Sequence, residues 1–503
     1  MSMQDSIVTG LRAFTSYMLE SRGRLVTFFL SLLVITFLLR LWQYGWAVND
    51  DGALYLYAAR NLIDHGLAEA LKTYPWAYYS VLVAYVDMAF FNNLLVSGWV
   101  LNFVFQCGQI YFFYRICSAL RVHQSRLFWA VVLFIISISF HNFRNYLMRD
   151  QGFILFIMIG VYYSLICINA DRLKSRLDKK SLILFVLSFV IAALFRIEAL
   201  VILAFGFLAV IYLTRQYLLG LLAGVVLLLA AAIGLLAIDM PQAEAWKYVS
   251  GKIPSVFVTF SQGQEILEAE LLSKYWAGHS GVGLFSLYIG TYFFYLSSSL
   301  SVYLLGLFYF QRKQKNNATI LLSVYALSIV VYCLVFLFSR GFLVFRYNLP
   351  LTYFLTALSI ILILSAAARQ ARFSKILLTL IIIVPLFKVL DAPSGSKRFL
   401  NEAQSKVEAM GLSGPAVYSN ALQVSLVNRV DYKKARTLKA EPTKVLKVLE
   451  SGLKPDVAVV YYGRSDEQVV VSGKNCLAYY VKHRRRTISV YVAKNEHCLM
   501  EQS

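Results

Sequence analysis

Long apolar runs alternate with short polar segments over the first 390 residues of the chain. A helix that crosses the hydrocarbon core of a bilayer needs about 20 mostly apolar residues. Eleven runs approach or reach that length. They cover residues 25–41, 96–114, 128–140, 153–168, 182–195, 199–213, 217–238, a run that closes before QRKQKNN, 320–338, 349–364 and 376–390. The pattern predicts a mainly α-helical, polytopic membrane protein with about eleven transmembrane helices.

Basic residues in the short loops predict the orientation of these spans, because lysine and arginine concentrate on the cytoplasmic side of a membrane. Arg22 and Arg24 place the N-terminus inside, so Asp50 and Asp51 emerge outside after the first span. Only an odd number of crossings fits between these acids and the next basic loop. We therefore expect the apolar stretch 76–91 to be a helix that lies on or dips into the outer face. The first run is expected to be a retained span, since no small-residue cleavage site follows it.

From residue 391 to residue 503 the pattern changes to that of a small soluble domain. The segments GPAVYSN, PDVAVVYYG, CLAYYVKH and TISVYVAK predict strands, and PTKVLKVLESG predicts an amphipathic helix ending at glycine. We expect a C-terminal α/β domain outside the cytoplasm, after a transmembrane domain of residues 1–390 with external loops at 45–95 and 241–281. The spacing of Cys476 and Cys498 fits either a disulfide or two separate buried thiols.

Composition agrees with this pattern. Of the 503 residues, 59% are hydrophobic and 15% are charged, and the mean hydropathy is +0.63. Soluble domains are typically about 45–50% apolar and about 25% charged. The formal net charge of +21 would suggest nucleic acid as a partner of a soluble chain. Here the basic residues lie mostly in the loops that orient the spans, so we expect a lipid bilayer and no nucleic acid as partner.

Ionisable side chains gather where this orientation places the outer membrane surface. They are Asp50, Asp51, His65, Arg144, Arg149, Asp150, Arg196, Glu198, Lys247, Lys252, His279, Arg340 and Arg346. Charges at membrane depth are costly, so a group of them indicates a functional cavity. The sequence therefore predicts that acids and arginines from at least four loops converge at the outer face.

Structural roles are open for the acids of this group. Asp50 or Asp51 suits the N-cap of a helix that starts near Ala53, because an aspartate oxygen accepts from the free amides of a first turn. Arg149 and Asp150 are neighbours that suit a local surface ion pair, which contributes little to stability. One aspartate of the first pair can cap the helix while the other acts chemically.

Structural roles are open for the other charged residues as well. Arg196 and Glu198 suit a pair at a helix break, and Arg346 suits a headgroup contact at the end of a span. His65 and His279 are lone histidines. No HExxH, CxxC, Walker loop or nucleophile elbow stands out in the sequence. We therefore predict no intrinsic metal site and no cofactor, although a divalent metal remains open.

Carboxylates that face arginines at a membrane surface suit transfer of a group from a lipid phosphate. A carboxylate can accept the proton of an acceptor hydroxyl as its oxygen attacks the anomeric carbon of a sugar. Arginines can bind the phosphate that leaves on the lipid, through charge-assisted and often bidentate hydrogen bonds. The lipid tail would lie along the apolar spans.

Four motifs in this order resemble the GT-C superfamily of integral-membrane glycosyltransferases, on the branch of protein O-mannosyltransferases and aminoarabinose transferases. The motifs are DDGALYLYAARNLIDHG in the first external loop, RNYLMRDQG before a later span, ALFRIEALV at a mid-chain break and FRYNLPL entering a late span. The resemblance covers nearly the whole chain. It implies a GT-C fold in which an acid of the first loop acts as general base.

The resemblance also suggests roles for individual residues. It implies that Asp51 is the general base with Tyr55 beside it, that Asp150 is the second acid and that Arg346 binds the lipid phosphate. The family pattern is Asp-Glu, whereas Gly52 follows Asp51 in this chain. The second acid precedes Asp51 instead, which leaves the base open between the two adjacent aspartates.

The expected function is transfer, with inversion, of one sugar from a polyprenyl-phosphate-linked donor to a glycan, lipid or protein acceptor. The resemblance implies a bacterial inner-membrane protein that acts on the periplasmic face. Two other functions stay open: en bloc transfer of an oligosaccharide from a pyrophosphate-linked donor, and transport or flipping of a lipid-linked substrate. The residues expected to bind the donor phosphate are Arg346, Arg340, Arg149, Arg196 and Lys247. The residues expected to line the substrate site are Tyr55, His65, Glu198 and His279.

Overall fold

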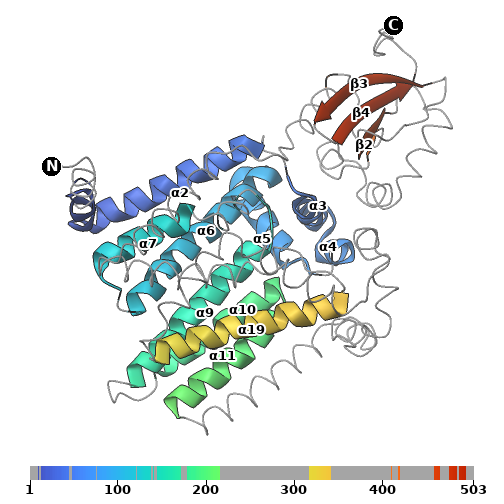
Figure 1. Ribbon diagram of the computed structural model, residues 1–503. Helices are drawn as coiled ribbons and strands as arrows, with labels where there is room; N and C mark the ends of the chain where they lie inside the picture. Colours follow the sequence, from blue (N-terminus) through green and yellow to red (C-terminus); the bar gives the residue numbers. More distant parts are fainter. Residues whose placement is uncertain are drawn as a thin grey trace, which may run out of the picture. The chain divides into compact units, whose positions relative to one another are not determined.

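A computed structural model gives the structure of the chain (Figure 1). It describes residues 10, 13–44, 48–74, 76–120, 122–136, 140, 144, 146–171, 178–215, 317–340, 409, 417–419, 458–464, 475–483 and 486–493. These residues belong to two compact units. The first unit draws on Met1–Leu32, Gln106–Phe140 and Asp150–Leu386, and the second on Leu33–Phe105, His141–Arg149 and Phe387–Ser503.

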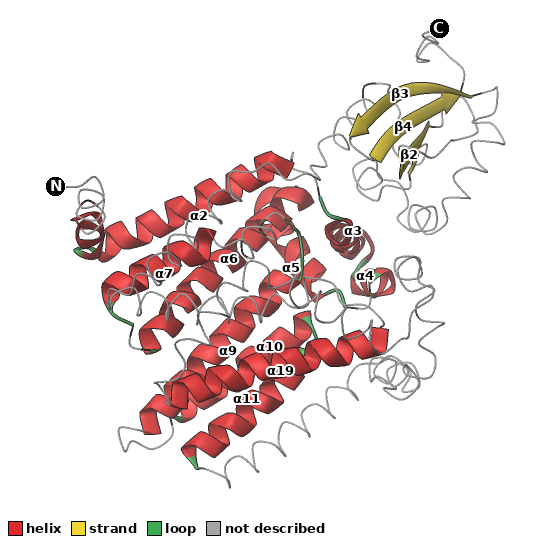
Figure 2. Ribbon diagram, in the orientation of Figure 1, coloured by secondary structure: helices red, strands yellow, loops and turns green. Residues whose placement is uncertain are grey.

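Helices account for most of the described residues, as the apolar pattern predicts (Figure 2). They are α2 (Arg22–Tyr44), α3 (Asp50–His65), α4 (Leu67–Thr73), α5 (Tyr78–Val86), the π-helix η1 (Asp87–Phe91), α6 (Leu94–Ala119), α7 (Gln124–Ile136), α9 (Asp150–Asp171), α10 (Lys179–Phe195), α11 (Ala199–Thr214) and α19 (Asn317–Arg340).

Three of these helices are long and apolar enough to cross a membrane: Arg22–Gln43, Leu94–Ala119 and Asp150–Asn169. Shorter apolar helices include Gln124–Ile136 and Ala199–Thr214. The chain is thus a multi-pass membrane protein. The spans expected at 217–238, 349–364 and 376–390, and the one before QRKQKNN, lie outside the described residues, so the number eleven remains a prediction.

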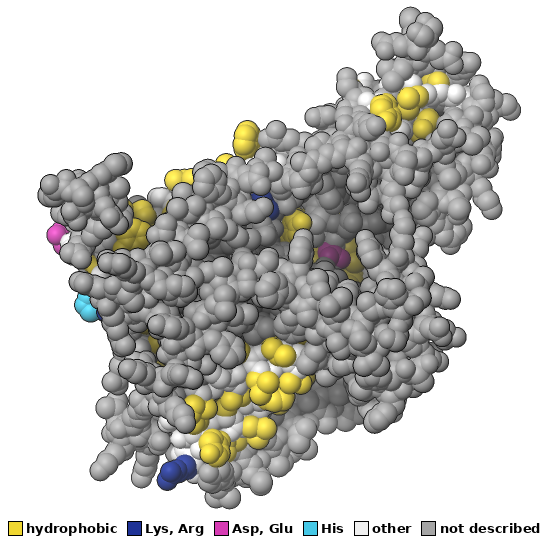
Figure 3. Space-filling view, in the orientation of Figure 1, with side chains coloured by type: hydrophobic (Ala, Val, Ile, Leu, Met, Phe, Trp, Pro, Cys, Tyr) yellow, Lys and Arg dark blue, Asp and Glu magenta, His cyan; other side chains and the backbone are white. Residues whose placement is uncertain are grey.

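In the first unit, α9, α10, α11 and α19 pack side by side (Figure 1). The rings of Phe189 and Tyr325 stack with centroids 6.0 Å apart and tilted by only 10°. Large side chains such as Leu208, Tyr212 and Leu327 are exposed instead. Apolar side chains gather over α11 and α19 in the lower part of Figure 3. This surface suits contact with lipid tails.

In the second unit, α3 packs against α4 and α5, and α5 continues into η1. The stretch expected to be a surface helix at 76–91 is therefore helical, and its position on the membrane remains a prediction. The capping prediction was wrong. The α3 helix begins at Asp50 rather than near Ala53, and its N-cap is Asn49. The helix ends before Gly66, whose φ of 85° lies in the region that favours glycine.

A four-stranded sheet forms from the C-terminal part of the chain, with one strand in each segment where the sequence predicts one (Figure 2). The strands are β1 (Val417–Ser419), β2 (Ala458–Arg464), β3 (Asn475–His483) and β4 (Arg486–Ala493), in the order β1-β2-β4-β3. The β1–β2 pair is parallel and the other two pairs are antiparallel. Ile488, Val490 and Val492 alternate with other residues along β4, and the consecutive residues Ser489, Val490 and Tyr491 are all buried, so both faces of the strand are covered at its centre.

The predicted helix PTKVLKVLESG lies outside the described residues, so the α/β domain from residue 391 to residue 503 remains a prediction. Cys476 in β3 is disulfide-bonded. Its predicted partner, Cys498, lies outside the described residues. The other four cysteines, at positions 107, 117, 167 and 333, are free thiols.

Candidate active site

The acidic pair Asp50 and Asp51, which follows the first apolar helix, lies in the first turn of α3. Asp50 is the first residue of the helix, and the Asp51 side chain is half-buried. The unpaired amides at a helix N-terminus carry a partial positive charge that stabilises carboxylates. Both aspartates therefore lie at the end of α3 that carries this partial positive charge.

Asn49 attaches another part of the chain to this turn. An N-cap asparagine normally accepts a hydrogen bond from an amide of its own helix. The Asn49 side chain makes no such bond. Its Oδ1 instead accepts from the Leu147 amide at 2.9 Å, although the two residues are 98 positions apart in the sequence. The start of α3 is thus joined to the segment that leads into α9.

Close packing at Gly52 explains why glycine rather than glutamate follows Asp51 in this chain. A Cβ atom at position 52 would lie 2.8 Å from the Cβ of Leu147 and 2.7 Å from Oδ1 of Asn49. Both distances are shorter than real Cβ contacts. A glutamate therefore cannot stand after Asp51 while residues 146–149 lie against the helix.

Two tyrosines and an arginine connect α3 to that segment. The Tyr55 ring is buried and meets the Tyr74 ring edge-on, with centroids 5.4 Å apart. The guanidinium carbon of Arg149 lies 5.6 Å from the centroid of Tyr74, in range of a cation–π interaction. Asp51 is one helical turn before Tyr55, on the same face of α3. The second unit therefore brings an acid, two tyrosines and an arginine together.

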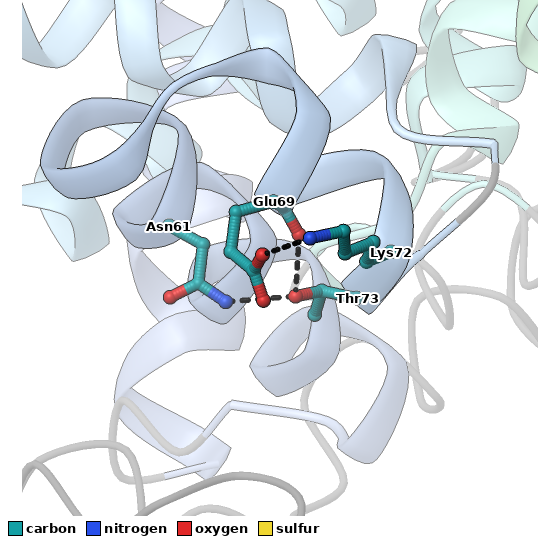
Figure 4. Close-up of polar contacts among 4 residues, drawn as sticks. All are labelled: Asn61, Glu69, Lys72 and Thr73. Carbon is teal, nitrogen blue, oxygen red and sulfur yellow. Dashed lines mark hydrogen bonds and ion pairs between the residues drawn. The ribbon is translucent and has the colours of Figure 1, made fainter.

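Sequence reasoning missed Tyr74, because the apolar pattern marks only a helix in that region. A buried hydrogen bond between α3 and the end of α4 fixes its position (Figure 4). Asn61 Nδ2 donates to Thr73 Oγ1 at 2.7 Å, and that hydroxyl donates to the Glu69 carbonyl at 3.0 Å. The Glu69 carboxylate pairs with Lys72 at 3.0 Å. Thr73 directly precedes Tyr74, so these bonds hold the ring against Tyr55.

The second predicted acid forms a buried ion pair in the first unit. Arg196 Nη1 lies 2.5 Å from Asp150 Oδ1, and the two side chains are only 2% and 4% exposed. Glu198 is 3.7 Å from Nε of the same guanidinium. The predicted surface pair between Arg149 and Asp150 was therefore wrong, because Asp150 pairs with an arginine 46 residues later in the chain.

Local packing explains how Asp150 and Arg196 meet. Arg196 is the extended residue that ends α10, and α11 begins at Ala199, so the predicted break is confirmed. A Cβ atom at Gly152, in the first turn of α9, would collide with the Phe195 ring. Glycine at this position lets the end of α10 lie directly on α9, beside Asp150. The Arg196 guanidinium also lies 5.7 Å from the centroid of the Phe153 ring.

Some of the remaining candidates lie among the described residues and others do not. Arg144 is fully buried rather than on the surface. His65 is exposed in the last turn of α3, 14 residues after Asp51, which corresponds to about 21 Å along a helix. Arg340 ends α19. Arg346, Lys247 and His279 lie outside the described residues.

Metal binding finds no support in the described part of the chain. No three His, Cys, Asp or Glu side chains gather there into a possible metal site. The buried Asp150 carboxylate pairs with the Arg196 guanidinium instead.

Comparison with known proteins shows similarity of fold. No protein-family model matches the sequence, and no curated protein matches it. A crystal structure of ArnT from Cupriavidus metallidurans bound to undecaprenyl phosphate matches with a TM-score of 0.50 and 11% identity, over 93% of this chain and 98% of that chain. The apo structure of the same protein matches with a TM-score of 0.48 and 11% identity, over 91% and 97% of the chains.

ArnT is a GT-C aminoarabinose transferase. The match extends over nearly the full length of both chains. The four motifs predict a GT-C fold, and the match confirms that prediction for the fold alone. The chain therefore has a GT-C-like fold.

Proposed function

We propose that the protein is a membrane glycosyltransferase that moves a single sugar from a polyprenyl-phosphate-linked donor to an acceptor on the periplasmic face. One observation carries the proposal. The half-buried Asp51 lies in the first turn of α3, and the same unit holds Arg149 over the Tyr74 ring that packs on Tyr55. The ligand of the similar ArnT structure, undecaprenyl phosphate, agrees in chemical class with the proposed donor.

Asp51 acts as the general base. Its carboxylate accepts the proton of the acceptor hydroxyl while the oxygen forms a bond to the anomeric carbon of the sugar. The bond from that carbon to the phosphate oxygen breaks, and its electron pair leaves on the lipid phosphate. Attack from the face opposite the phosphate inverts the anomeric centre. Asp50, beside the base, adds negative charge to the same helical turn.

Arginine stabilises the phosphate as it leaves. Arg149 projects from the segment that lies against the start of α3, so its charge lies in the same unit as the base. Arg346, Arg340 and Lys247 complete the set that we propose for the donor. Charge-assisted hydrogen bonds from guanidinium groups suit a phosphate well.

Asp150 takes a different role from the one its motif suggests. Its carboxylate is engaged with Arg196 in a buried pair. The carboxylate and the guanidinium are thus engaged with each other in the interior of the first unit. We therefore assign Asp150, Arg196 and Glu198 to holding the α9–α10–α11 junction rather than to the reaction.

Sidedness completes the proposal. The N-terminus lies in the cytoplasm of a bacterial cell, the spans cross the inner membrane, and the C-terminal domain lies in the periplasm. The orientation rests on the basic loops, whereas the bacterial inner membrane rests on the resemblance to GT-C glycosyltransferases. The acceptor is a glycan, a lipid or a protein of the cell envelope.

Complementation in membranes tests the function. Wild type, Asp51→Asn and Asp50→Asn are expressed at matched levels, with His65→Ala as the control, and envelope glycans and lipids are analysed by mass. We expect Asp51→Asn to lose a mass increment of one sugar that His65→Ala retains. An increment of a whole oligosaccharide, abolished by a chelator, would identify en bloc transfer. If every variant keeps all products, the catalytic proposal is wrong and transport becomes the better hypothesis.

A further inference from the structure

Two asparagine side chains hold the backbone of the segment that carries Arg149. Asn102 of α6 donates from Nδ2 to the Tyr146 carbonyl at 2.6 Å. Asn49 accepts from the adjacent Leu147 amide at 2.9 Å. Two consecutive residues are therefore fixed by side chains from two other parts of the second unit. Arg149 follows two residues later, so these bonds limit where its guanidinium can lie.

The Asn49 side chain binds Leu147 instead of capping the helix that Asn49 precedes. A capping side chain stabilises a helix by about 0.5–2 kcal/mol, and asparagine is among the best residues for that purpose. The Asn49 side chain caps no amide of α3. Its Oδ1 accepts from the Leu147 amide instead. The arrangement favours placement of the 146–149 segment over stability of the helix.

Asn102 uses both ends of its amide. Its Oδ1 accepts from the Tyr79 hydroxyl at 2.9 Å, while its Nδ2 binds Tyr146. The Tyr79 ring meets the Tyr55 ring edge-on, with centroids 5.3 Å apart. Asn102 is fully buried within an apolar helix, where an amide is costly unless it is hydrogen-bonded. One side chain thus connects the tyrosines beside Asp51 to the segment of Arg149.

We propose that Asn49 and Asn102 are positioning residues that fix the Arg149 guanidinium relative to Asp51, and so determine where the lipid phosphate of the donor is bound. The inference rests on the proposed function. Neither asparagine touches the reacting atoms. Both act through the backbone of residues 146 and 147, which lie within the motif RNYLMRDQG but received no role of their own from the resemblance.

Hydrogen exchange tests the placement without any substrate. Full-length protein in lipid nanodiscs is compared as wild type, Asn49→Ala and Asn49→Asp, with Asn169→Ala as the control. Asn169 also donates to a backbone carbonyl, that of Ala119, but in the first unit. In Asn49→Ala the peptide that contains Leu147 should exchange about threefold to tenfold faster, because its amide loses a hydrogen bond. Asn49→Asp keeps the acceptor oxygen and should restore protection.

Kinetics tests the link to Arg149. Asn102→Ala should lower kcat/KM for the donor about 10- to 10²-fold, since small misplacement of a binding group is that costly, while the acceptor KM stays unchanged. The effect should vanish in an Arg149→Ala background, because contacts in one network are not additive. If Asn102→Ala is not recovered folded, Asn102→Asp replaces it, since it keeps the acceptor for Tyr79 and loses the donor to Tyr146.

The outcomes separate the two proposals. The positioning role would be overturned if Asn102→Ala lowered kcat/KM for the donor equally in the wild-type and Arg149→Ala backgrounds. It would also be overturned if the Leu147 peptide exchanged at the wild-type rate in Asn49→Ala. A wild-type protein that transfers no sugar would overturn the proposed function. The exchange result alone would then still decide whether the asparagines fix the segment.

Discussion

Asp51 and Asp150 both lie in the first turn of a helix, yet their surroundings differ. Asp51 is half-buried beside a tyrosine cluster in the second unit. Asp150 is almost fully buried in the first unit, with Arg196 at 2.5 Å. The position of a carboxylate in a motif therefore does not decide its role. Access for a substrate hydroxyl and engagement with a cation decide it.

Adjacent residues of one motif also take different roles. Arg149 belongs to the second unit and lies over Tyr74, whereas Asp150 belongs to the first unit and binds Arg196. The chain therefore changes from a proposed reactive region to a structural one across a single peptide bond. Substitutions at these positions should separate activity from stability.

The largest expected effect is on activity. Asp51→Asn removes the proton acceptor and should lower the rate of sugar transfer about 10²–10⁴-fold, with thermal stability close to wild type. Transfer in isolated membranes, measured by mass of the product, checks it. Asp50→Asn is the matched control on the neighbouring residue and should lose less. Equal losses in both variants would mean that the two acids act together.

The next effect is on stability. Arg196→Met leaves the buried Asp150 carboxylate without its cation and should cost about 3–5 kcal/mol. Asp150→Asn combined with Arg196→Met removes both charges and should be more stable than Arg196→Met alone. Thermal unfolding in detergent measures both variants. A double variant that is less stable than Arg196→Met would contradict the prediction. It would show that the Asp150 carboxylate stabilises the fold even without its partner Arg196.

Packing at the two helix starts gives a smaller effect. Gly52→Ala and Gly152→Ala each place a Cβ against a neighbouring segment and should cost about 1–3 kcal/mol by overpacking. The two should differ in activity. Gly52→Ala pushes on Leu147 and should weaken donor binding, whereas Gly152→Ala pushes on Phe195 and should not. Donor KM values corrected for folded protein distinguish them.

The smallest effect concerns the contact that orients Tyr74. Asn61→Ala removes the donor to Thr73 Oγ1 and should destabilise the fold by about 1 kcal/mol. It should also raise the donor KM slightly through Tyr74. Lys72→Ala breaks an exposed ion pair and serves as a control for stability, where the expected change is under about 1 kcal/mol. Chemical denaturation of the purified protein measures both.

Much of the helical architecture follows from local pattern. The span after Arg24, the helix after Asp50 and the break at Arg196 are encoded by runs of apolar residues and by their interruptions. The predicted start of α3 was wrong. Asn49 occupies the N-cap position, but its side chain binds the Leu147 amide and caps no amide of α3. No local rule foresees an asparagine that gives its oxygen to a residue 98 positions away.

The site was less predictable, since its members meet only through tertiary contacts. Tyr74 and Asn102 lie in apolar stretches where they look like ordinary helix residues. Arg149 could be predicted as a charge at the outer face but not as a partner of Tyr74. The glycines at 52 and 152 carried a signal that sequence reasoning did not use: each follows an acid closely and permits another segment to lie on the helix start.

A side-by-side measurement of Asp51→Asn and Asp150→Asn tests the division between the two acids most directly. Each protein is purified in detergent, its thermal midpoint is recorded, and its transfer rate is measured per folded molecule in reconstituted membranes. We expect Asp51→Asn to keep its midpoint and lose transfer, and Asp150→Asn to lower its midpoint and keep transfer. The reverse result, with Asp51 needed for stability and Asp150 for transfer, would contradict the roles assigned to both residues.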